Sequence, residues 1–363
     1  MQSTKHRSSL SVPCLVCLLG IALLAVPAQA QTFAYVTNSS SSSVSVIDTA
    51  TNAVTATIEV EGRPIGVAFT PDGSRVYVAN SESNSVSVID TATNTVTATI
   101  AVGSFPQGLA FTPNGSSAYV GSSFSNSVSV IDTATNTVVD TINIGRDSTA
   151  VAITPDGSRA YLTSTGTGAV SVIDTATNTV IATIGIGGAP VGVAITPDGS
   201  RAYVANNSIA SVSVIDTATN TMIATVAQAQ PVGVAITPDG SRAYVSNNST
   251  AAGSVSVIDT ATNTVTATVG VGLNAQSLAI TADGTHVYVA CFSANSVFVI
   301  DTATNTVTAT VAVGFAPVGV AITPGIGPPT NKSLCKRGGW KLFTIPRKFK
   351  NQGDCVSFVN TGK

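Results

Sequence analysis

The octapeptide SVIDTATN at Ser45–Asn52 is the first copy of a motif whose Ile-Asp-Thr-Ala-Thr-Asn core occurs seven times in the chain. The motif aspartates are Asp48, Asp90, Asp132, Asp174, Asp216, Asp259 and Asp301. Successive aspartates are 42 residues apart, except for one gap of 43. Self-similarity at a period of about 40–50 residues is typical of stacked or radially arranged repeats. The pattern therefore predicts one large repeat unit.

Each repeat predicts four short strands. In the fourth copy of the first strand, Gly192–Ile195 is a brief apolar run, and the Thr-Pro-Asp-Gly sequence after it favours a tight hairpin. Arg201–Ala205 follows as a second strand, and Ser211–Ile215 alternates polar and apolar residues as a third. The motif turn then leads into a fourth strand, Thr221–Val226. Four antiparallel strands in about 42 residues are the content of one propeller blade.

The number of turns predicts how the ring closes. The motif turn occurs seven times, but the Pro-Asp-Gly type of turn occurs only six times, at Asp72, Asn114, Asp156, Asp198, Asp239 and Asp283. The repeats begin on a second-type strand, Phe33–Thr37, and end on a first-type strand, Gly319–Thr323. We expect the C-terminal strand to complete a blade with the three N-terminal strands, which removes open sheet edges. The predicted fold is all-β, a seven-bladed propeller of four-stranded antiparallel blades.

The second strands carry a family resemblance. Tyr35-Val36-Thr37-Asn38 and its later counterparts, such as Tyr77–Asn80 and Tyr203–Asn206, resemble the YVTN-type β-propeller repeat of bacterial and archaeal surface proteins. The resemblance covers residues 31–324. It implies a seven-bladed propeller with the Gly-Val-Ala-Ile strand nearest the axis, in an exported or surface protein.

The N-terminal residues 1–30 are typical of a secretory signal peptide. Lys5 and Arg7 precede an apolar run, Val12–Val26, and Ala28-Gln29-Ala30 fits a small-x-small cleavage site. An uncleaved membrane anchor is the alternative, although the run is short for spanning a bilayer. We expect export to the periplasm, the cell surface or the medium, with no membrane span after cleavage.

Charge is unevenly distributed along the chain. Residues 31–323 hold 17 acidic side chains and six arginines but no lysine, a net charge of −11, whereas residues 324–363 carry a net charge of +7. The basic tail is predicted to contact an anionic partner or the acidic propeller. Nucleic-acid binding by the propeller is disfavoured, because phosphate contacts require Lys and Arg.

The residues after the propeller form a separate C-terminal element, residues 325–363. A Gly- and Pro-rich linker, Gly325–Thr330, precedes a segment that contains Cys335 and Cys355. Two cysteines in a small exported segment predict a disulfide between them. Cys291, which replaces the asparagine of other repeats, is then expected to be a free, partly buried thiol.

The repeated polar residues have structural explanations. We expect the motif aspartates to cap their own turns rather than to bind metal, and the seven tyrosines to pack between blades. Arg75, Arg159, Arg201 and Arg242 recur after the hairpin glycine and are interpreted as surface charges. No Ser-His-Asp set, haem-attachment motif or zinc-type cluster is visible, so no catalytic residue, metal or cofactor is predicted.

The residues that break the repeat are the candidate partner-binding site. The loops that lead into the first strands differ strongly from one another, and strand polarity places them on the same face as the loops after the tyrosine strands. Neutral drift is the alternative explanation for this variation. The candidate binding residues are Arg63, Phe105, Arg146, Asp147, Gln230, Asn274 and Phe315.

The leading functional hypothesis is an exported or cell-surface propeller that acts as a non-catalytic, monomeric binding scaffold. Its partner would be a protein or a surface glycan, held by the variable loops. The alternative is a periplasmic propeller enzyme, similar to a lactone hydrolase or a dehydrogenase, with its site in the central channel. An enzyme would need titratable groups that converge at the channel mouth.

Overall fold

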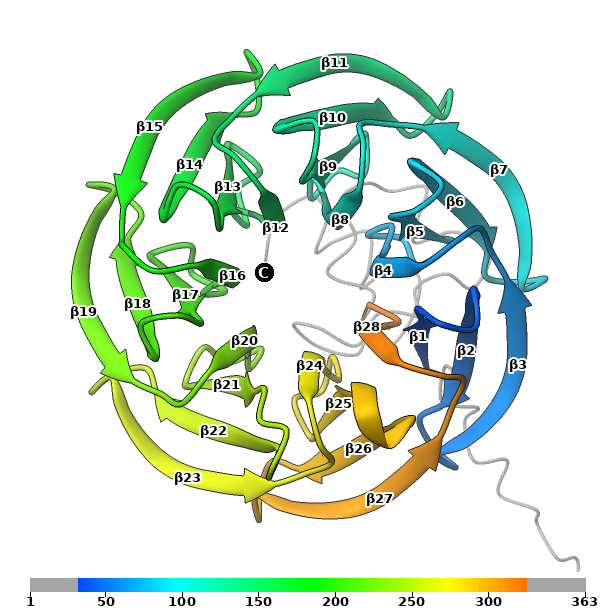
Figure 1. Ribbon diagram of the computed structural model, residues 1–363, viewed down its shortest axis with the longest axis vertical. Coiled ribbons are helices and arrows are strands. Elements are labelled where there is room, and N and C mark those ends of the chain that lie inside the picture. Colours follow the sequence, from blue (N-terminus) through cyan, green and yellow to red (C-terminus); the bar gives the residue numbers. More distant parts are fainter. Residues whose placement is uncertain (1–31, 325–363) are drawn as a thin grey trace, which may run out of the picture. The chain divides into compact units, whose positions relative to one another are not determined.

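The computed structural model describes residues 32–324, which form seven four-stranded antiparallel sheets arranged in a ring (Figure 1). The prediction of an all-β, seven-bladed propeller is confirmed. Beyond its strands, this part of the chain has one short 3-10 helix, η1 (Phe292–Ala294). No helix within residues 32–324 is long and apolar enough to cross a membrane. The predicted signal peptide and the predicted Cys335–Cys355 disulfide lie outside the described residues.

Each blade contains an innermost, a second, a third and an outer strand. The innermost strands are β4 (Pro64–Phe69), β8 (Pro106–Phe111), β12 (Ser148–Ile153), β16 (Pro190–Ile195), β20 (Pro231–Ile236), β24 (Ala275–Ile280) and β28 (Pro317–Ile322). The second strands are β1 (Phe33–Asn38), β5 (Arg75–Asn80), β9 (Ser117–Ser122), β13 (Arg159–Ser164), β17 (Arg201–Asn206), β21 (Arg242–Asn247) and β25 (His286–Cys291).

The third strands carry the repeated Ser-Val-Ser-Val-Ile-Asp sequence or close variants of it. They are β2 (Ser43–Asp48), β6 (Ser85–Asp90), β10 (Ser127–Asp132), β14 (Ala169–Asp174), β18 (Ser211–Asp216), β22 (Ser254–Asp259) and β26 (Ser296–Asp301). The outer strands are β3 (Ala53–Glu59), β7 (Thr95–Ala101), β11 (Thr137–Asn143), β15 (Thr179–Gly185), β19 (Thr221–Ala227), β23 (Thr264–Gly270) and β27 (Thr306–Ala312). Blade 1 contains β28, β1, β2 and β3, and blades 2 to 7 follow in chain order from β4.

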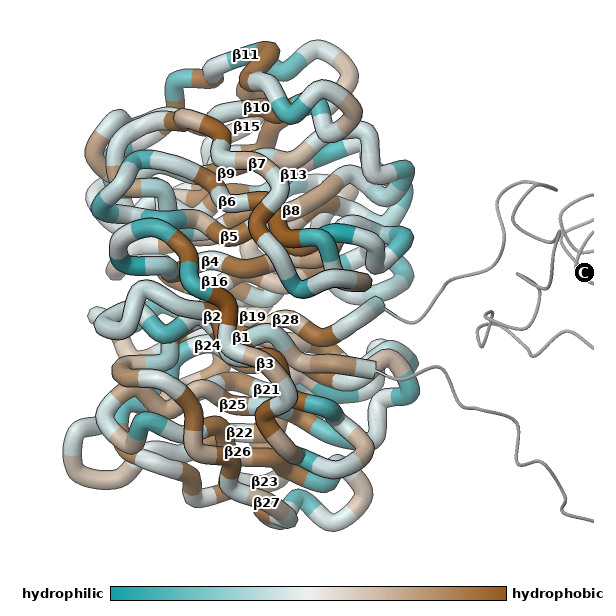
Figure 2. The backbone as a smooth tube through the Cα atoms, turned by 90° about the vertical axis from the view of Figure 1, so that its right-hand side faces the viewer, coloured by the Kyte–Doolittle hydropathy of each residue, from teal (hydrophilic) through white to brown (hydrophobic). Residues whose placement is uncertain are grey.

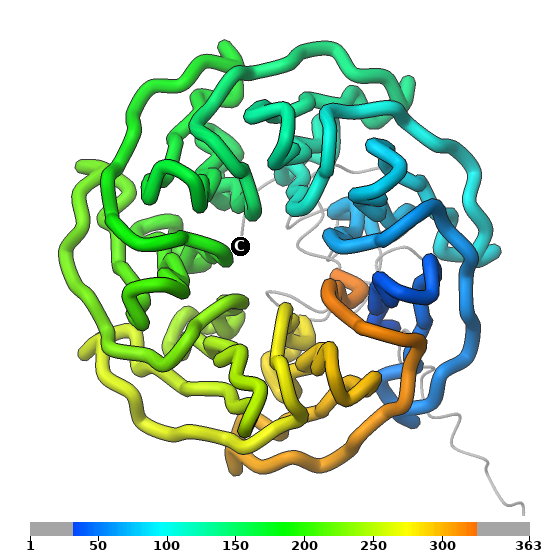
Figure 3. Tube along the Cα trace, in the orientation of Figure 1, coloured from blue at the N-terminus to red at the C-terminus, as the bar shows by residue number. Residues whose placement is uncertain are grey.

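The ring closes through β28, as the number of turns predicted. This strand pairs antiparallel with β1, in a register that places Ile322 opposite Ala34 and Val320 opposite Val36. The backbone N–H of Thr323 donates to the carbonyl of Phe33 at 2.8 Å. Figure 3 shows the last strand lying beside the first strands of the chain. Blade 1 is therefore built from the two ends of the propeller.

The hydrophobic core lies between neighbouring blades. One buried cluster, for example, joins Tyr77 and Val88 of blade 2 to Leu109 and Val120 of blade 3. All seven tyrosines are at most 1% exposed, which confirms that they pack between blades. Seen edge-on in Figure 2, hydrophilic residues gather in the loops on the two faces of the ring, and hydrophobic residues lie between them. Burial of these apolar surfaces is the main force that holds the blades together.

A belt of hydrogen bonds links each blade to the next. The hydroxyl of Tyr119 in blade 3 donates to Oδ1 of Asn178, the last residue of the motif turn in blade 4, at 2.6 Å. The same bond recurs in every blade, and Tyr288 closes the belt by donating to Asn52 at 2.7 Å. Burial, with a further contribution from Asp48, raises the pKa of Tyr288 to about 12. These hydroxyls therefore stay protonated and able to donate at ordinary pH.

The repeated arginines also connect neighbouring blades, so their interpretation as surface charges was incomplete. Arg75 Nη1 donates to the carbonyl oxygen of Thr133, in the motif turn of the next blade, at 2.8 Å. Three further blades repeat this bond through Arg159, Arg201 and Arg242. A guanidinium suits this role, because it carries several donors in a fixed geometry.

The motif turns are closed by their own aspartates, as predicted. Asp132 Oδ1 accepts hydrogen bonds from the backbone N–H of Thr135 at 2.8 Å and of Ala134 at 3.0 Å. Hydrogen bonds from the backbone and the hydroxyl of Thr135 hold the pKa of Asp132 below its usual value. Asn136, which ends the turn, has a φ of 54°, a left-handed conformation that asparagine tolerates well. The seven near-identical turns form what we call the turn face.

Candidate functional site

The variable loops gather on the face of the ring opposite the turn face, as strand polarity predicted. We call this surface the variable face. It contains seven connecting loops, each leading from an outer strand to the next innermost strand, at residues 60–63, 102–105, 144–147, 186–189, 228–230, 271–274 and 313–316. It also contains the loops between second and third strands, at residues 39–42, 81–84, 123–126, 165–168, 207–210, 248–253 and 292–295. Within a blade the two loops touch.

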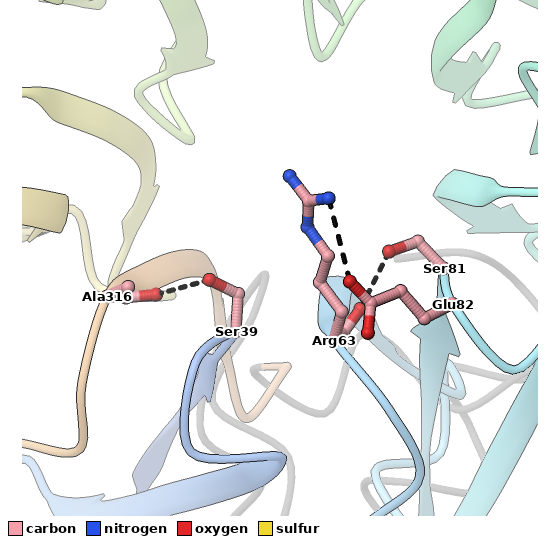
Figure 4. A network of polar contacts seen from close by, with 5 residues as sticks. All are labelled: Ser39, Arg63, Ser81, Glu82 and Ala316. Carbon is pink, nitrogen blue, oxygen red and sulfur yellow. Dashed lines mark hydrogen bonds and ion pairs between the residues drawn. The ribbon is translucent and has the colours of Figure 1, made fainter.

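Hydrogen bonds hold the two kinds of loop together. The backbone N–H and the hydroxyl of Ser81 both donate to the carbonyl oxygen of Arg63, at 3.0 and 2.9 Å. Ser39 makes the same pair of bonds to Ala316 in blade 1. Figure 4 shows both contacts, with the Arg63 side chain extending away from its loop and Glu82 beside it. The loop backbones are thus tied down, while their side chains are presented to solvent.

Several of the predicted binding residues have a left-handed backbone. Arg63, Phe105, Asp147, Gln230 and Asn274 have φ values of 54°, 57°, 59°, 49° and 55°. This region is uncommon for residues other than glycine, asparagine and aspartate, and positions of this kind persist only where the surroundings enforce them. Ala316, at the same loop position in blade 1, has a φ of 56°, so this conformation belongs to the repeat backbone. The left-handed conformation fixes the direction in which each loop presents its side chain.

Arg63 and Phe105 form the centre of an exposed cation–aromatic stack. The guanidinium carbon of Arg63 lies 5.4 Å from the centre of the Phe105 ring. Phe105 stacks on Phe124, with ring centres 4.5 Å apart and an interplanar angle of 19°. Arg63 Nη1 also lies 3.8 Å from a carboxylate oxygen of Glu82. Phe124 remains 69% exposed, so an apolar surface next to a cation faces solvent across blades 2 and 3.

Phe124 and Glu82 were missed from the sequence, because each lies in a loop between second and third strands that was judged only by its variability. The signal available was the large apolar Phe124, although Ile209 and Phe292 also place large apolar side chains in the corresponding loops of blades 5 and 7. Phe124 becomes informative through its stacking on Phe105, because a contiguous apolar surface is more significant than a single exposed side chain.

The other predicted binding residues lie on the variable face but do not join this stack. Arg146 and Gln230 are exposed, and Phe315 is 67% exposed. The backbone N–H of Asp147 donates to Asn126 Oδ1 at 3.3 Å, and Asn274 Nδ2 donates to Ser293 Oγ at 2.7 Å. Of the predicted set, only Arg63 and Phe105 are brought into contact with each other as an exposed cluster.

The central channel is bounded by innermost strands that carry no titratable side chain. Their sequences are PIGVAF, PQGLAF, STAVAI, PVGVAI, PVGVAI, AQSLAI and PVGVAI. General acid–base catalysis needs groups with suitable pKa values close together, and these strands supply none. Across residues 32–324, no three His, Cys, Asp or Glu side chains converge as a metal-binding group.

Cys291 is fully buried rather than partly buried, because the strand end that it occupies is covered by the connecting loop around Gly272. The structure confirms that it is a free thiol. Burial raises the pKa of Cys291 to about 12. The thiolate is the reactive form of cysteine, so this side chain should be inert in the folded protein.

We therefore expect iodoacetamide to leave Cys291 unmodified in the native protein at pH 8 and to modify it completely after unfolding. Peptide mapping under non-reducing conditions reads out each cysteine separately, and it should also show Cys335 bonded to Cys355. Rapid native labelling of Cys291, or its linkage to either tail cysteine, would contradict this prediction.

Comparison with known proteins supports a propeller. A family model described as the choice-of-anchor I domain matches residues 122–322, more than half of the 363-residue chain. No curated protein matches the chain. The YVTN-type label drawn from the tyrosine strands stays a resemblance.

Several solved structures share the fold. A functionally unknown protein from Desulfotomaculum acetoxidans DSM 771 is 22% identical, with a TM-score of 0.70 over 80% of this chain and 99% of that chain. Kuenenia stuttgartiensis hydrazine synthase is 24% identical, with a TM-score of 0.67 over 72% of this chain and 90% of that chain. The dihydro-heme d1 dehydrogenase NirN in complex with DHE is 16% identical, with a TM-score of 0.60 over 79% of this chain and 74% of that chain. At these identities the likeness extends to the fold alone.

Proposed function

The chain belongs to the choice-of-anchor I domain family, and we propose that it is an exported or surface-associated binding scaffold that holds a partner on its variable face without catalysis. The family description refers to anchoring, which supports a protein attached to or displayed at a surface. The signal-like residues 1–30 support export independently. The partner is a macromolecule, a protein or a surface glycan, and the propeller acts as a monomer.

The stack of Arg63, Phe105 and Phe124 is the observation that carries this proposal. Arginine and aromatic side chains dominate the binding energy of many interfaces. Here they are exposed together on loops whose backbones are already fixed, so little conformational entropy is lost on binding. The turn face, by contrast, repeats one sequence seven times and uses its aspartates internally.

The rival proposal is an enzyme with a site in the central channel. Two of the similar structures are named as enzymes, hydrazine synthase and the dehydrogenase NirN, which keeps this alternative open. The innermost strands of this chain carry neither acid nor base, so the scaffold is the better-supported function. An activity in the purified chain that survives loss of the stack would favour the rival.

A capture experiment with three forms of the full mature chain tests the scaffold. The stack variant carries Arg63→Ala, Phe105→Ala and Phe124→Ala. The matched control carries Thr93→Ala, Thr177→Ala and Thr262→Ala on the turn face, where these threonines are equally exposed. Each form is immobilised and exposed to a cell-envelope extract, and retained material is identified by mass spectrometry.

We expect a partner retained by the wild type and the control to be reduced at least about tenfold by the stack variant, because losing hot-spot side chains costs more than about 2 kcal/mol. Retention by the stack variant together with loss in the control would show that the turn face is the binding surface. The control removes three exposed threonine hydroxyl bonds to the motif aspartates, so we expect its melting temperature to fall slightly while all three forms stay folded.

A further inference from the structure

Gln228 occupies a position that is apolar in every other blade. Its backbone N–H donates to the carbonyl oxygen of Ala210 at 2.9 Å, just as Ile186 N–H donates to Gly168 at 3.0 Å one blade earlier. The equivalent residues in the other connecting loops are Val60, Val102, Ile144, Ile186, Val271 and Val313. These side chains pack on the core clusters. Gln228 is 7% exposed, as Ile186 is, and is more buried than the other five counterparts, which are half-buried.

Two loop lengths change at the same place. The connecting loop before β20 has only residues 228–230, whereas the corresponding loop before β16 has residues 186–189. The loop after β21 spans residues 248–253, whereas the loop after β17 spans residues 207–210. Gln228 lies in the shorter loop, and the longer loop is bonded to that loop through the backbone N–H of Asn248, which donates to the carbonyl oxygen of Gln230 at 2.9 Å. The polar residue Gln228 and the two changes in loop length therefore occur together at the junction of blades 5 and 6.

Two buried amide atoms at this junction have no hydrogen-bond partner in the protein. One is a donor, Nε2 of Gln228, and the other is an acceptor, Oδ1 of Asn247. Asn247 is 5% exposed, and its Nδ2 donates to Ser254 Oγ and Ser256 Oγ at 3.1 and 2.9 Å. Unpaired buried polar atoms are costly, so native proteins normally satisfy them.

Equivalent asparagines elsewhere leave the same acceptor unpaired, but no unpaired amide donor accompanies it; in blade 5 the unpaired group opposite Asn206 is the hydroxyl of Ser211. Asn38, Asn80 and Asn206 each have an unpaired Oδ1, and the connecting-loop residue at the position of Gln228 is Val or Ile in their blades. Only blade 6, among the described blades, places an unpaired amide donor and an unpaired acceptor beside one pocket.

The pocket has a volume of about 570 Å³ and opens at the surface. Its lining includes Gln228, Asn247 and methyl groups of Ala210, Ala227 and Ala229, and none of its lining residues is charged. Because the pocket is mostly open to solvent, it is a shallow depression that can hold one group of a ligand rather than enclose the whole molecule. A ligand here must be neutral, must accept one hydrogen bond and donate another, and must present a small apolar group.

We propose that this pocket binds the acetamido group of a neutral N-acetylated sugar. Both amide atoms are covered in the unliganded protein, so their side chains must rotate toward the pocket before the acetamido carbonyl accepts from Gln228 Nε2 and its N–H donates to Asn247 Oδ1. The acetamido methyl group then contacts the alanines. The sugar hydroxyls extend from the open side of the pocket. This site is separate from the stack of Arg63, Phe105 and Phe124, so the two proposals can be tested independently.

The test is a titration of the full mature chain, labelled with ¹⁵N, with N-acetyl-D-glucosamine. We expect saturable shifts of the side-chain amide resonances of Gln228 and Asn247, with a Kd on the order of 1 mM. D-glucose, which lacks the acetamido group, should produce no comparable shift at the same concentration. Equal shifts with both sugars, or none with N-acetyl-D-glucosamine, would overturn the proposal.

Two variants and a control separate binding from folding. Gln228→Val restores the residue type of the other blades, so it should fold with unchanged or higher Tm and weaken binding at least about tenfold. Asn247→Ser copies the serine of the equivalent Ser122 and should weaken binding similarly. Asn206→Ser makes the same change in blade 5 and should leave binding unchanged. Undiminished binding by Gln228→Val would show that the sugar binds elsewhere.

Discussion

We expect truncation after Val318 to lower the melting temperature by roughly 10 °C or more. Truncation after Pro324 should leave the melting temperature unchanged. The shorter chain keeps the pair of Pro317 with Asn38 but lacks Val320, Ala321 and Ile322, the other residues of β28 that pair with β1. Several ladder hydrogen bonds at about 1 kcal/mol each and the burial of Val320 and Ile322 at about 2 kcal/mol each are lost. A loss on the order of 5 kcal/mol corresponds to a fall of at least about 10 °C.

Thermal unfolding followed by circular dichroism compares the two truncations directly. The chain that ends at Pro324 is the matched control, because it removes the basic tail and the cysteines Cys335 and Cys355 but keeps every strand of the propeller. The chain that ends at Val318 exposes the edge of β1 and should also aggregate more readily. Equal melting temperatures would mean that β28 does not secure the ring.

The fold could be predicted from the sequence because the repeat specifies both the strands of one blade and the number of blades. Seven motif turns against six Pro-Asp-Gly-type turns identified the split blade, and pairing of β28 with β1 confirms it. Alternation of the strands also placed the variable loops on one face. These conclusions depend only on strand direction and on the spacing of the repeats, and both can be read from the sequence.

Contacts between blades were not predictable in the same way. The partner of Tyr119 is Asn178, which is 59 residues away and belongs to another repeat. Asn178 looked like a turn residue that needs no other role, and Arg75 looked like a surface charge. Both bridge to a neighbouring blade, and such bridges depend on how far the repeats rotate about the axis. The only sequence signal for these contacts was that the tyrosine and the motif-turn asparagine recur at a similar spacing in every repeat.

The candidate site was predicted only in part for a related reason. Variability identified the loops, but it could not show that Arg63 and Phe105, on different blades, share a stack with Phe124. Gln228 lies in one of the loops that were judged only by their variability, whereas the structure places it at a buried position. Gln228 and its six apolar counterparts each lie 12 residues after their motif aspartate, so the sequence did contain the signal, but the loops were compared only for their variability.

The innermost strands approach one another too closely for side chains at most of their contacts. Five of the seven have glycine at the third residue, at Gly66, Gly108, Gly192, Gly233 and Gly319. A Cβ atom on Gly66 would lie 2.0 Å from the carbonyl oxygen of Gln107 in the next blade. That atom belongs to the backbone, so it cannot rotate away. These glycines set how tightly the ring closes around its axis.

Gly66→Ala is therefore expected to destabilise the propeller by about 3 kcal/mol, at the upper end of the cost of overpacking. The melting temperature should fall by roughly 6–10 °C. The matched control is Gly185→Ala in the outer strand β15, where an added Cβ meets nothing within 4 Å. This change should be neutral or slightly stabilising, because glycine weakens strand interiors relative to alanine.

Thermal unfolding of Gly66→Ala and Gly185→Ala tests this prediction. The effect of Gly66→Ala is steric rather than conformational, since Gly66 is not among the glycines with positive φ. Ala150 and Ser277 occupy the equivalent positions in blades 4 and 7, so the ring already accommodates a side chain at two of its seven contacts. If Gly66→Ala melts within about 2 °C of the wild type, the same adjustment is available at every contact, and the glycines do not set the closure of the ring.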